Sequence, residues 1–346
     1  MAETKSKEQI FLSSTKWPSI NRNIRNITPA SRDSSWLIFF LKIALSALAF
    51  SIVAFSVDLS AAWKHAANQS MAYIGISAAI LLLQILLGGL RWHAISVKLG
   101  ANPSVSESVR LYYISAFFNS YLWGAIGGDV LRAWLTYRRE FSAKLAINSV
   151  VLDRVAALAG VAILVVVTVP IFLSRVGNAL PMYIPVGLSF AGLFGIAMVA
   201  YLHGLPAAWL NTRFMRFLQS LGGSVKQIFL NPKAALPVLG FAVAAQIALG
   251  IATFAMAASL GIKTSMVDCI VLMQPVPLLA NLPISVGGWG VRETAVVFLF
   301  GLVGVPSSAA LVLSMQLGLL ALLIALPGGV MWLLLQFKER VLDSTT

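Results

Sequence analysis

Charged residues are scarce in this chain of 346 residues. Only 11% are Asp, Glu, Lys or Arg, against about a quarter in a typical soluble domain, while 59% are hydrophobic. Mean hydropathy is +0.87, so a soluble fold of this size would leave a large apolar surface uncovered. The composition therefore excludes an ordinary soluble enzyme and indicates a membrane protein built from apolar segments.

Several chemistry-bearing patterns are also missing. Cys269 is the only cysteine, so no internal disulfide can form, and the three histidines (His65, His93 and His203) have no metal-ligand spacing. The chain has no P-loop pattern, no HExxH and no Ser/His/Asp arrangement typical of nucleophilic catalysis. We expect no metal, no cofactor and no enzymatic activity, and no use of ATP by this chain.

The formal net charge of +13 would suggest a nucleic-acid partner in a soluble protein. Here the Lys and Arg residues lie in short stretches between apolar runs, which favours a topological role and contact with anionic lipid heads over nucleic acid. With the N-terminus in the cytoplasm, four of them fall outside (Lys64, Arg175, Lys263 and Arg292) and Lys42 at a boundary, leaving 20 of 25 inside. This asymmetry predicts a multi-pass protein of the bacterial inner membrane with both termini cytoplasmic.

Six apolar runs are long enough to cross the roughly 20 residues of a bilayer span. The runs are Trp36–Val57, Met71–Leu90, Val155–Ser174, Met182–Leu202, Leu236–Leu260 and Ser307–Phe337. Residues 1–35 are predicted to form a basic, disordered cytoplasmic tail, residues 36–337 the membrane domain and residues 338–346 a second cytoplasmic tail. The Arg91-Trp92 pair that ends the second run is predicted to anchor at the membrane interface.

Two further apolar segments, Leu111–Leu131 and Asp268–Leu302, are each interrupted by a glycine-rich turn. Broken segments of this kind predict half-helices joined at membrane depth, where protein or a watery cavity must surround the turn. The predicted fold is an all-α polytopic membrane protein with about six full spans plus two re-entrant broken-helix hairpins. The alternative is that some of these segments are ordinary spans, which would make about eight crossings.

The two broken segments share a motif: an Asn, an apolar stretch, then Gly-Gly-x-x-x-Arg. The matching residues are Asn119, Gly127, Gly128 and Arg132 in the first segment and Asn281, Gly287, Gly288 and Arg292 in the second. In the predicted topology the two hairpins point in opposite directions, which is the pattern of inverted repeats in transport proteins.

Such a turn has a definite chemistry. Glycine permits positive φ and close backbone approach, and the half-helix that follows presents unpaired N–H groups and a positive dipole end. Arginine holds a phosphate through two parallel hydrogen bonds. We therefore predict that both Gly-Gly turns, both Asn residues, Arg132 and Arg292 bind an anion or lipid phosphate near the midplane.

Acidic residues stand beside these arginines. Asp129 is interpreted first as a cap of the following half-helix and second as a proton carrier. Because adjacent residues do not share a helix face, Asp153 and Arg154 are expected to pair elsewhere, Asp153 with an arginine such as Arg132. Glu293 lies in an apolar context, where an unpaired charge is costly, so it is assigned with Asp129, Asp153 and Arg154 to charge balance or proton transfer.

Three motifs in order resemble one known family. They are Gly127-Gly-Asp-Val-Leu-Arg-Ala-Trp134, Ser149-Val-Val-Leu-Asp-Arg154 and Pro283-Ile-Ser-Val-Gly-Gly-Trp-Gly-Val-Arg-Glu293. The chain resembles, over about residues 35–340, the flippase-like transmembrane family related to the membrane region of lysylphosphatidylglycerol synthase. The resemblance implies an integral membrane protein whose best-studied relatives are proposed to move aminoacylated phosphatidylglycerol between leaflets. It implies no aminoacyl transfer here, because the cytosolic domain that performs it is absent.

The leading hypothesis is a lipid translocase, flippase- or scramblase-like, whose partner is a membrane phospholipid or another phosphate-bearing lipid. A secondary transporter of a small soluble anion would use the same arginines in a cavity sealed from lipid. A third hypothesis is an accessory subunit that docks on an enzyme of envelope lipid or glycan synthesis through its basic loops.

Overall fold

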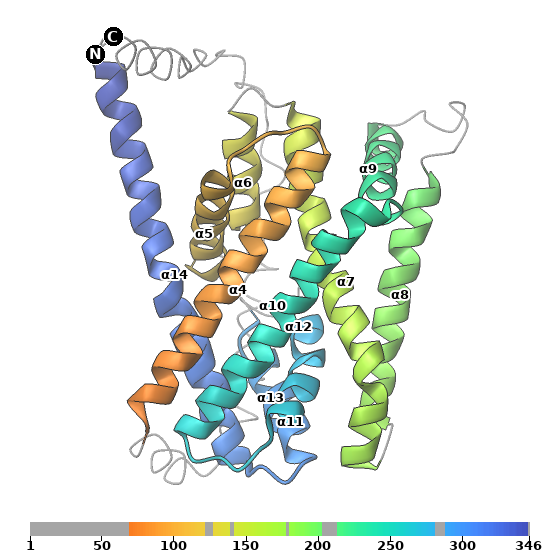
Figure 1. Cartoon of the computed structure of the whole chain (residues 1–346), viewed down its shortest axis with the longest axis vertical. Helices are drawn as coiled ribbons and strands as arrows, with labels where there is room; N and C mark the ends of the chain where they lie inside the picture. Colours follow the sequence, from red (N-terminus) through yellow and green to blue (C-terminus); the bar gives the residue numbers. More distant parts are fainter. Residues whose placement is uncertain are drawn as a thin grey trace, which may run out of the picture.

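The computed structural model describes residues 69–121, 127–138, 142–177, 180–202, 213–280 and 288–344. Every regular element in these ranges is a helix, and the labels used below are those of Figure 1. The helices are α4 (Met71–Lys98), α5 (Val105–Tyr121), α6 (Gly127–Tyr137), α7 (Ala143–Val176), α8 (Leu180–Leu202), α9 (Arg213–Phe229), α10 (Pro232–Ser259), α11 (Met266–Met273), α12 (Pro275–Ala280), α13 (Val291–Gly301) and α14 (Ser307–Ser344).

Five helices are long and apolar enough to cross a membrane: α4, α7, α8, α10 and α14. They correspond to five of the six predicted spans, and the all-α polytopic fold is confirmed. The sixth predicted span, Trp36–Val57, and the tail of residues 1–35 lie outside the described residues. Helix α14 continues to Ser344, so the predicted C-terminal tail begins as a continuation of the last span.

Helices α4 and α7 are longer than the apolar runs predicted. The second run was expected to end at Leu90, whereas α4 continues to Lys98, and α7 begins at Ala143, before the predicted start at Val155. Hydropathy places a span boundary at the first charged residue. The helices continue through these charges because, as shown below, the charges are paired inside the protein.

The two broken segments form hairpins that enter the bundle from opposite ends (Figure 1). Helix α5 runs inward from the upper end in Figure 1 and α6 returns to that end, while α11 and α12 run inward from the lower end and α13 returns there. Helices α6 and α13 have 11 residues each, well under the roughly 20 needed to cross a bilayer. In both segments the later helix returns to the end from which the earlier one entered, as the re-entrant prediction expects.

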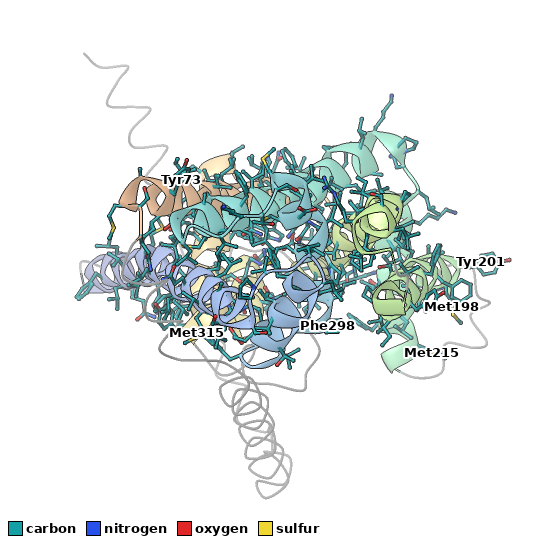
Figure 2. All side chains as sticks on the ribbon, turned by 90° about the horizontal axis from the view of Figure 1, so that it is seen from below. Tyr73, Met198, Tyr201, Met215, Phe298 and Met315 are labelled. Atoms are coloured by element: carbon teal, nitrogen blue, oxygen red, sulfur yellow. The ribbon has the colours of Figure 1, made fainter. Side chains whose placement is uncertain are left out.

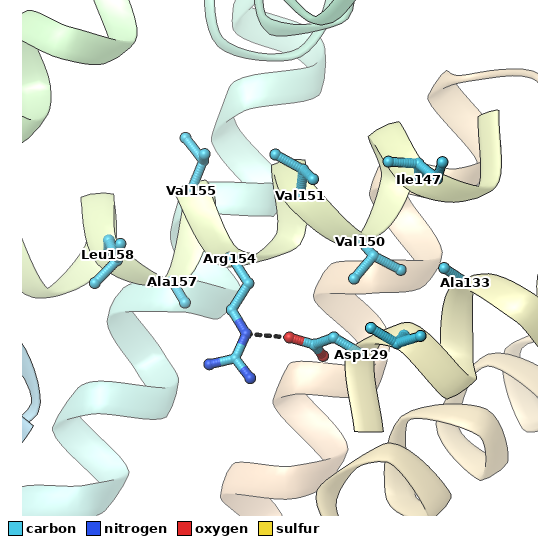
Figure 3. A pocket seen from close by; sticks show the side chains of 10 residues that line it. Asp129, Ala133, Ile147, Val150, Val151, Arg154, Val155, Ala157 and Leu158 are labelled. Carbon is cyan, nitrogen blue, oxygen red and sulfur yellow. Dashed lines mark hydrogen bonds and ion pairs between the residues drawn. The ribbon is translucent and has the colours of Figure 1, made fainter. Parts of the chain in front are cut away.

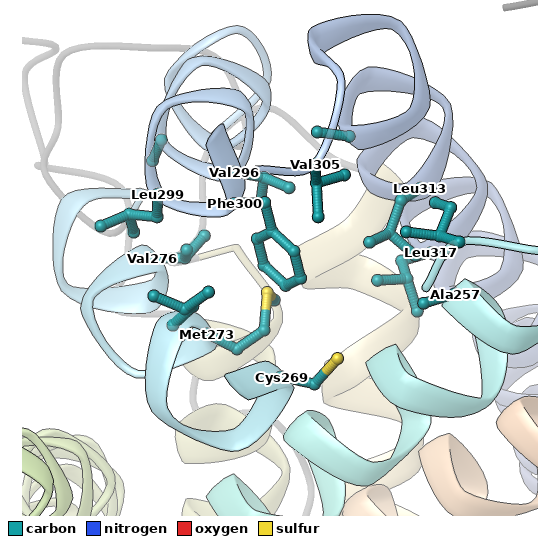
Figure 4. Close-up of a cluster of buried hydrophobic side chains, with 14 of the residues drawn as sticks. Ala257, Cys269, Met273, Val276, Val296, Leu299, Phe300, Val305, Leu313 and Leu317 are labelled. Atoms are coloured by element: carbon teal, nitrogen blue, oxygen red, sulfur yellow. The ribbon is translucent and has the colours of Figure 1, made fainter. Parts of the chain in front are cut away.

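The second hairpin encloses an apolar core, shown in Figure 4. Phe300 of α13 is fully buried among Met273 of α11 and Leu313 and Leu317 of α14. Gly250 of α10 lies directly against the backbone of Ile270, where a Cβ would not fit. Close packing of this kind holds the short helices in place although none of them spans the bilayer.

Helix α9 was not predicted, since residues 203–234 were interpreted only as a cytoplasmic loop. Its buried residues Leu221, Val225 and Ile228 pack with Ile95 of α4 and Leu152 of α7. The helix covers one end of the bundle beside α8 and α10 (Figure 1). Its amphipathic pattern, apolar at Leu218, Leu221, Val225 and Ile228, is the signal that would have identified it.

The outer surface of the bundle is strongly apolar. Figure 2 shows Tyr73, Met198, Tyr201 and Phe298 at the periphery, pointing away from the bundle, and all four are exposed. A soluble protein rarely exposes so continuous an apolar surface, whereas lipid tails cover it without cost. The chain is therefore a multi-pass membrane protein.

Candidate functional site

The first Gly-Gly turn is held by Asn119. The Oδ1 atom of Asn119 accepts the backbone N–H of Gly128 at 2.9 Å, which satisfies one of the unpaired N–H groups at the start of α6. A Cβ on Gly128 would overlap the carbonyl of Ser115 in α5, so only glycine permits this approach of the two half-helices. In this motif, the Asn caps the start of α6 and the second Gly allows α5 and α6 to approach closely.

Arg132 lies one turn further along α6 and is almost completely buried. Its guanidinium lies over the rings of Trp92 and Tyr112, at 5.0 and 4.9 Å from their centroids. The Nη2 atom donates to Asp129 at 3.1 Å and to Asp153 at 2.9 Å. The predicted pairing of Asp153 with Arg132 is confirmed.

The ion pairs continue on both sides of Arg132. Arg91 of α4 donates through Nε to Asp153 at 2.7 Å, and Arg154 of α7 pairs with Asp129 of α6. We call these five side chains (Arg91, Arg132, Arg154, Asp129 and Asp153) the ion network. It ties α4, α6 and α7 together, and its three arginines and two aspartates carry a formal charge of +1.

One sequence interpretation needs correction here. Arg91 and Trp92 do not anchor at the interface, because both are buried and Arg91 belongs to the ion network. Asp129 lies in the first turn of α6, and among the described residues its partners are the side chains of Ser115, Asn119, Arg132 and Arg154. Asn119 caps Gly128 because its amide can accept that N–H and donate to Asp129 together.

The second turn is built differently. Gly288 and Gly290 have φ angles of 81° and 84°, which favour glycine, and Glu293 accepts the N–H of Gly290 at 2.6 Å. Arg292 donates to the same carboxylate from Nε at 3.0 Å and from Nη2 at 2.5 Å. Glu293 is fully buried, so it acts both as a cap for α13 and as the counter-charge for its neighbour.

Arg292 is more accessible than Arg132. About a quarter of its side chain (24%) is exposed, against 1% for Arg132. Its guanidinium lies 4.4 Å from the Trp289 ring centroid and against Gly318 of α14, where a Cβ would overlap it. Glycine at position 318 therefore provides the space that the Arg292 head occupies.

The structure thus places the predicted residues in two sets. The set at the first turn contains Asn119, Gly127, Gly128, Asp129, Arg132, Asp153 and Arg154. The set at the second turn contains Gly288, Arg292 and Glu293. The two sets share no residue, so the prediction that both arginines form one site is not supported by these contacts. Asn281 and Gly287 lie outside the described residues.

A pocket of about 610 Å³ opens between α6 and α7 beside the ion network (Figure 3). Its wall carries the Asp129–Arg154 ion pair, and its other lining residues are Val130, Ala133, Ile147, Val150, Val151, Val155, Ala157 and Leu158. Val130, Ile147 and Leu158 are also exposed on the outer surface. We call this cavity the α6–α7 pocket; it is apolar, with one ion pair, and borders the exposed apolar surface.

Residues 39–336 match the family described as the lysylphosphatidylglycerol synthase TM region. The chain belongs to this family. The match covers the membrane region and nearly the whole chain, and it includes both Gly-Gly turns and the ion network. A comparison with curated proteins finds none that matches this chain. Among the described residues of this family member, no group of His, Cys, Asp or Glu is arranged to hold a metal ion.

Three important residues of this family member were missed from the sequence. Arg91 looked like an interfacial residue because it follows an apolar run, and Tyr112 and Gly318 carried no signal at all. Only the three-dimensional packing of α4, α5 and α14 brings them to the two arginines.

Proposed function

We propose that this protein moves a phosphate-bearing lipid between the leaflets of the inner membrane. The observation that carries the proposal is the α6–α7 pocket, an apolar cavity at the exposed apolar surface with a charged pair in its wall. A phospholipid has the same division between a charged head and apolar tails. The family description, which names a lipid synthase's membrane region, agrees with a lipid-related role.

The lining of the pocket favours a lipid over a small soluble anion. Eight of its ten lining residues are Val, Ala, Ile or Leu, and none of them can replace the water that surrounds a free anion. An acyl chain gains from contact with such a wall. A sealed polar cavity, which a soluble anion would require, is not what these residues form.

Arg154 is the residue best placed to receive the phosphate. Its side chain is 39% exposed and lines the pocket, whereas Arg132 is enclosed by two rings and two carboxylates. A phosphate approaching Arg154 would form charge-assisted hydrogen bonds while Asp129 keeps its bond to Arg132. A phosphate at Arg154 would therefore leave Asp129 with a counter-charge, because Asp129 also pairs with Arg132.

Leaflet exchange in proteoliposomes tests this proposal. The purified protein, reconstituted with fluorescent phosphatidylglycerol, should accelerate exchange over protein-free vesicles. Arg154→Gln should slow exchange by roughly tenfold or more, the value of one charge-assisted hydrogen bond. Arg175→Gln is the matched control, because Arg175 also pairs with an aspartate, Asp268, at 3.4 Å but lies half-exposed and away from the pocket.

Two results would overturn the proposal. One is exchange by the wild-type protein no faster than in empty vesicles. The other is an equal rate for Arg154→Gln, Arg175→Gln and the wild type, which would remove the pocket from the path. Release of trapped inorganic phosphate without lipid exchange would favour the small-anion transporter instead.

A further inference from the structure

A second, smaller cavity lies further along α7 and shares the lining residue Leu158 with the α6–α7 pocket. It has a volume of about 210 Å³ and is lined by Leu158, Ala159 and Ala162 of α7, Leu188, Gly192 and Leu193 of α8, and Leu278 of α12. Leu158 lines both cavities, and Figure 3 shows it at the end of the larger pocket away from Ile147 and Ala133. The two cavities therefore adjoin at Leu158.

The two cavities differ in the polarity of their linings. The larger cavity carries the Asp129–Arg154 pair, whereas every residue that lines the smaller one is Leu, Ala or Gly. Small side chains at Ala159, Ala162 and Gly192 keep the second cavity open. A ligand that fits both cavities has an anionic group at one end and a narrow apolar part at the other.

The distance along α7 between Arg154 and the far end of the smaller cavity indicates how long the apolar part of such a ligand can be. From Arg154 to Ala162 the α7 helix rises by about 12 Å, at 1.5 Å per residue. One leaflet of a bilayer contributes about 15 Å of hydrocarbon, half of the whole core. An acyl chain whose phosphate lies at Arg154 is therefore long enough to reach the far end of the smaller cavity.

We propose that the two cavities form one groove that binds a single acyl chain of the phosphate-bearing lipid, with the phosphate at Arg154 and the chain passing Leu158 toward Leu278. This deepens the proposed function and rests on it for the identity of the lipid. Leu278 lies in α12, so the groove runs from the first hairpin to an element of the second. The lipid tail, rather than a contact between Arg132 and Arg292, links the two hairpins.

The test uses phosphatidylglycerol with a photoactivatable diazirine at the end of one long acyl chain. After irradiation of proteoliposomes, peptide mapping should find label on the α8 segment that contains Leu188 and Leu193. Gly192→Phe places a ring in the smaller cavity at a position where a Cβ meets nothing within 4 Å, so the fold should tolerate it. Labelling of this segment should fall about tenfold, because the ring excludes roughly two methylenes of the chain.

Gly187→Phe is the matched control. Gly187 is on the same helix, also has open space at its Cβ and does not line either cavity. We expect labelling of Gly187→Phe to equal that of the wild type. A diazirine placed beside the headgroup should instead label the α7 segment around Arg154.

The outcomes separate this inference from the proposed function. One outcome is label spread evenly over α8, with equal labelling of Gly192→Phe and Gly187→Phe. It would mean that only annular lipid is labelled and would overturn the proposed groove, even if the wild type exchanges lipid. Label confined to the groove and lost in Gly192→Phe would support it, even if wild-type exchange proved absent. In that case the protein binds the lipid without moving it.

Discussion

The two hairpins carry the same sequence motif in very different surroundings. At the first turn, Arg132 is enclosed by two aromatic rings and shares two aspartates with Arg91 and Arg154 from neighbouring helices. At the second, Arg292 pairs with the adjacent Glu293 and its head lies against Gly318, partly exposed. A motif thus fixes the turn and the position of the cation, while the neighbouring helices decide whether that cation is locked or accessible.

The largest effect is expected at Asp153, which joins Arg91 and Arg132. Asp153→Asn would leave two buried guanidinium groups short of a counter-charge, and loss of one partner of a buried pair costs roughly 3–5 kcal/mol. Heating in mild detergent with a maleimide dye can measure this, because Cys269 is the only cysteine and is fully buried until the protein unfolds.

The corresponding change at the second turn is Glu293→Gln, which we expect to cost less, about 1–3 kcal/mol. The amide oxygen can still accept the Gly290 N–H, and Arg292 is exposed enough to be solvated. Equal loss of stability in Asp153→Asn and Glu293→Gln would contradict the difference drawn between the two turns.

Substitution of the glycines near the two turns also tests the difference between them, with smaller expected losses of stability. Gly128→Ala would bring a methyl group against the Ser115 carbonyl, which is backbone and cannot rotate away, so a loss of roughly 1–3 kcal/mol is expected. The same dye assay measures it. Gly240→Ala, at a helical glycine with nothing within 4 Å of its Cβ, should melt like the wild type or slightly higher.

Gly318→Ala should have the smallest effect on stability. Its methyl group meets only the flexible end of Arg292, which can move aside, so we expect a cost of no more than about 1 kcal/mol, the order of one cation–π contact. The displaced head should leave the Trp289 ring, which tryptophan fluorescence would report as a changed response to a soluble quencher. A cost as large as that of Gly128→Ala would mean that Arg292 is held as rigidly as Arg132.

Much of the architecture followed from composition and spacing. The spans at α4, α7, α8, α10 and α14 and the two broken segments were predictable, because apolar runs must cover a fixed bilayer thickness and glycine-rich turns interrupt them. The family followed from the resemblance of three motifs instead. Asp153 was correctly paired with Arg132. Helix ends were less accurate, since Arg91 and Asp153 look like span boundaries when their partners are unknown.

The sequence by itself determined a membrane-embedded helical protein with an arginine one turn after each Gly-Gly pair. Only the tertiary structure decided that Arg91 is buried, that Asn119 accepts the N–H of Gly128, and that the accessible cation beside the α6–α7 pocket is Arg154. The physical reason is that the cost of a charge in an apolar medium depends on its nearest counter-charges. At the first turn those counter-charges come from helices far apart in the chain, whose crossing no local pattern specifies.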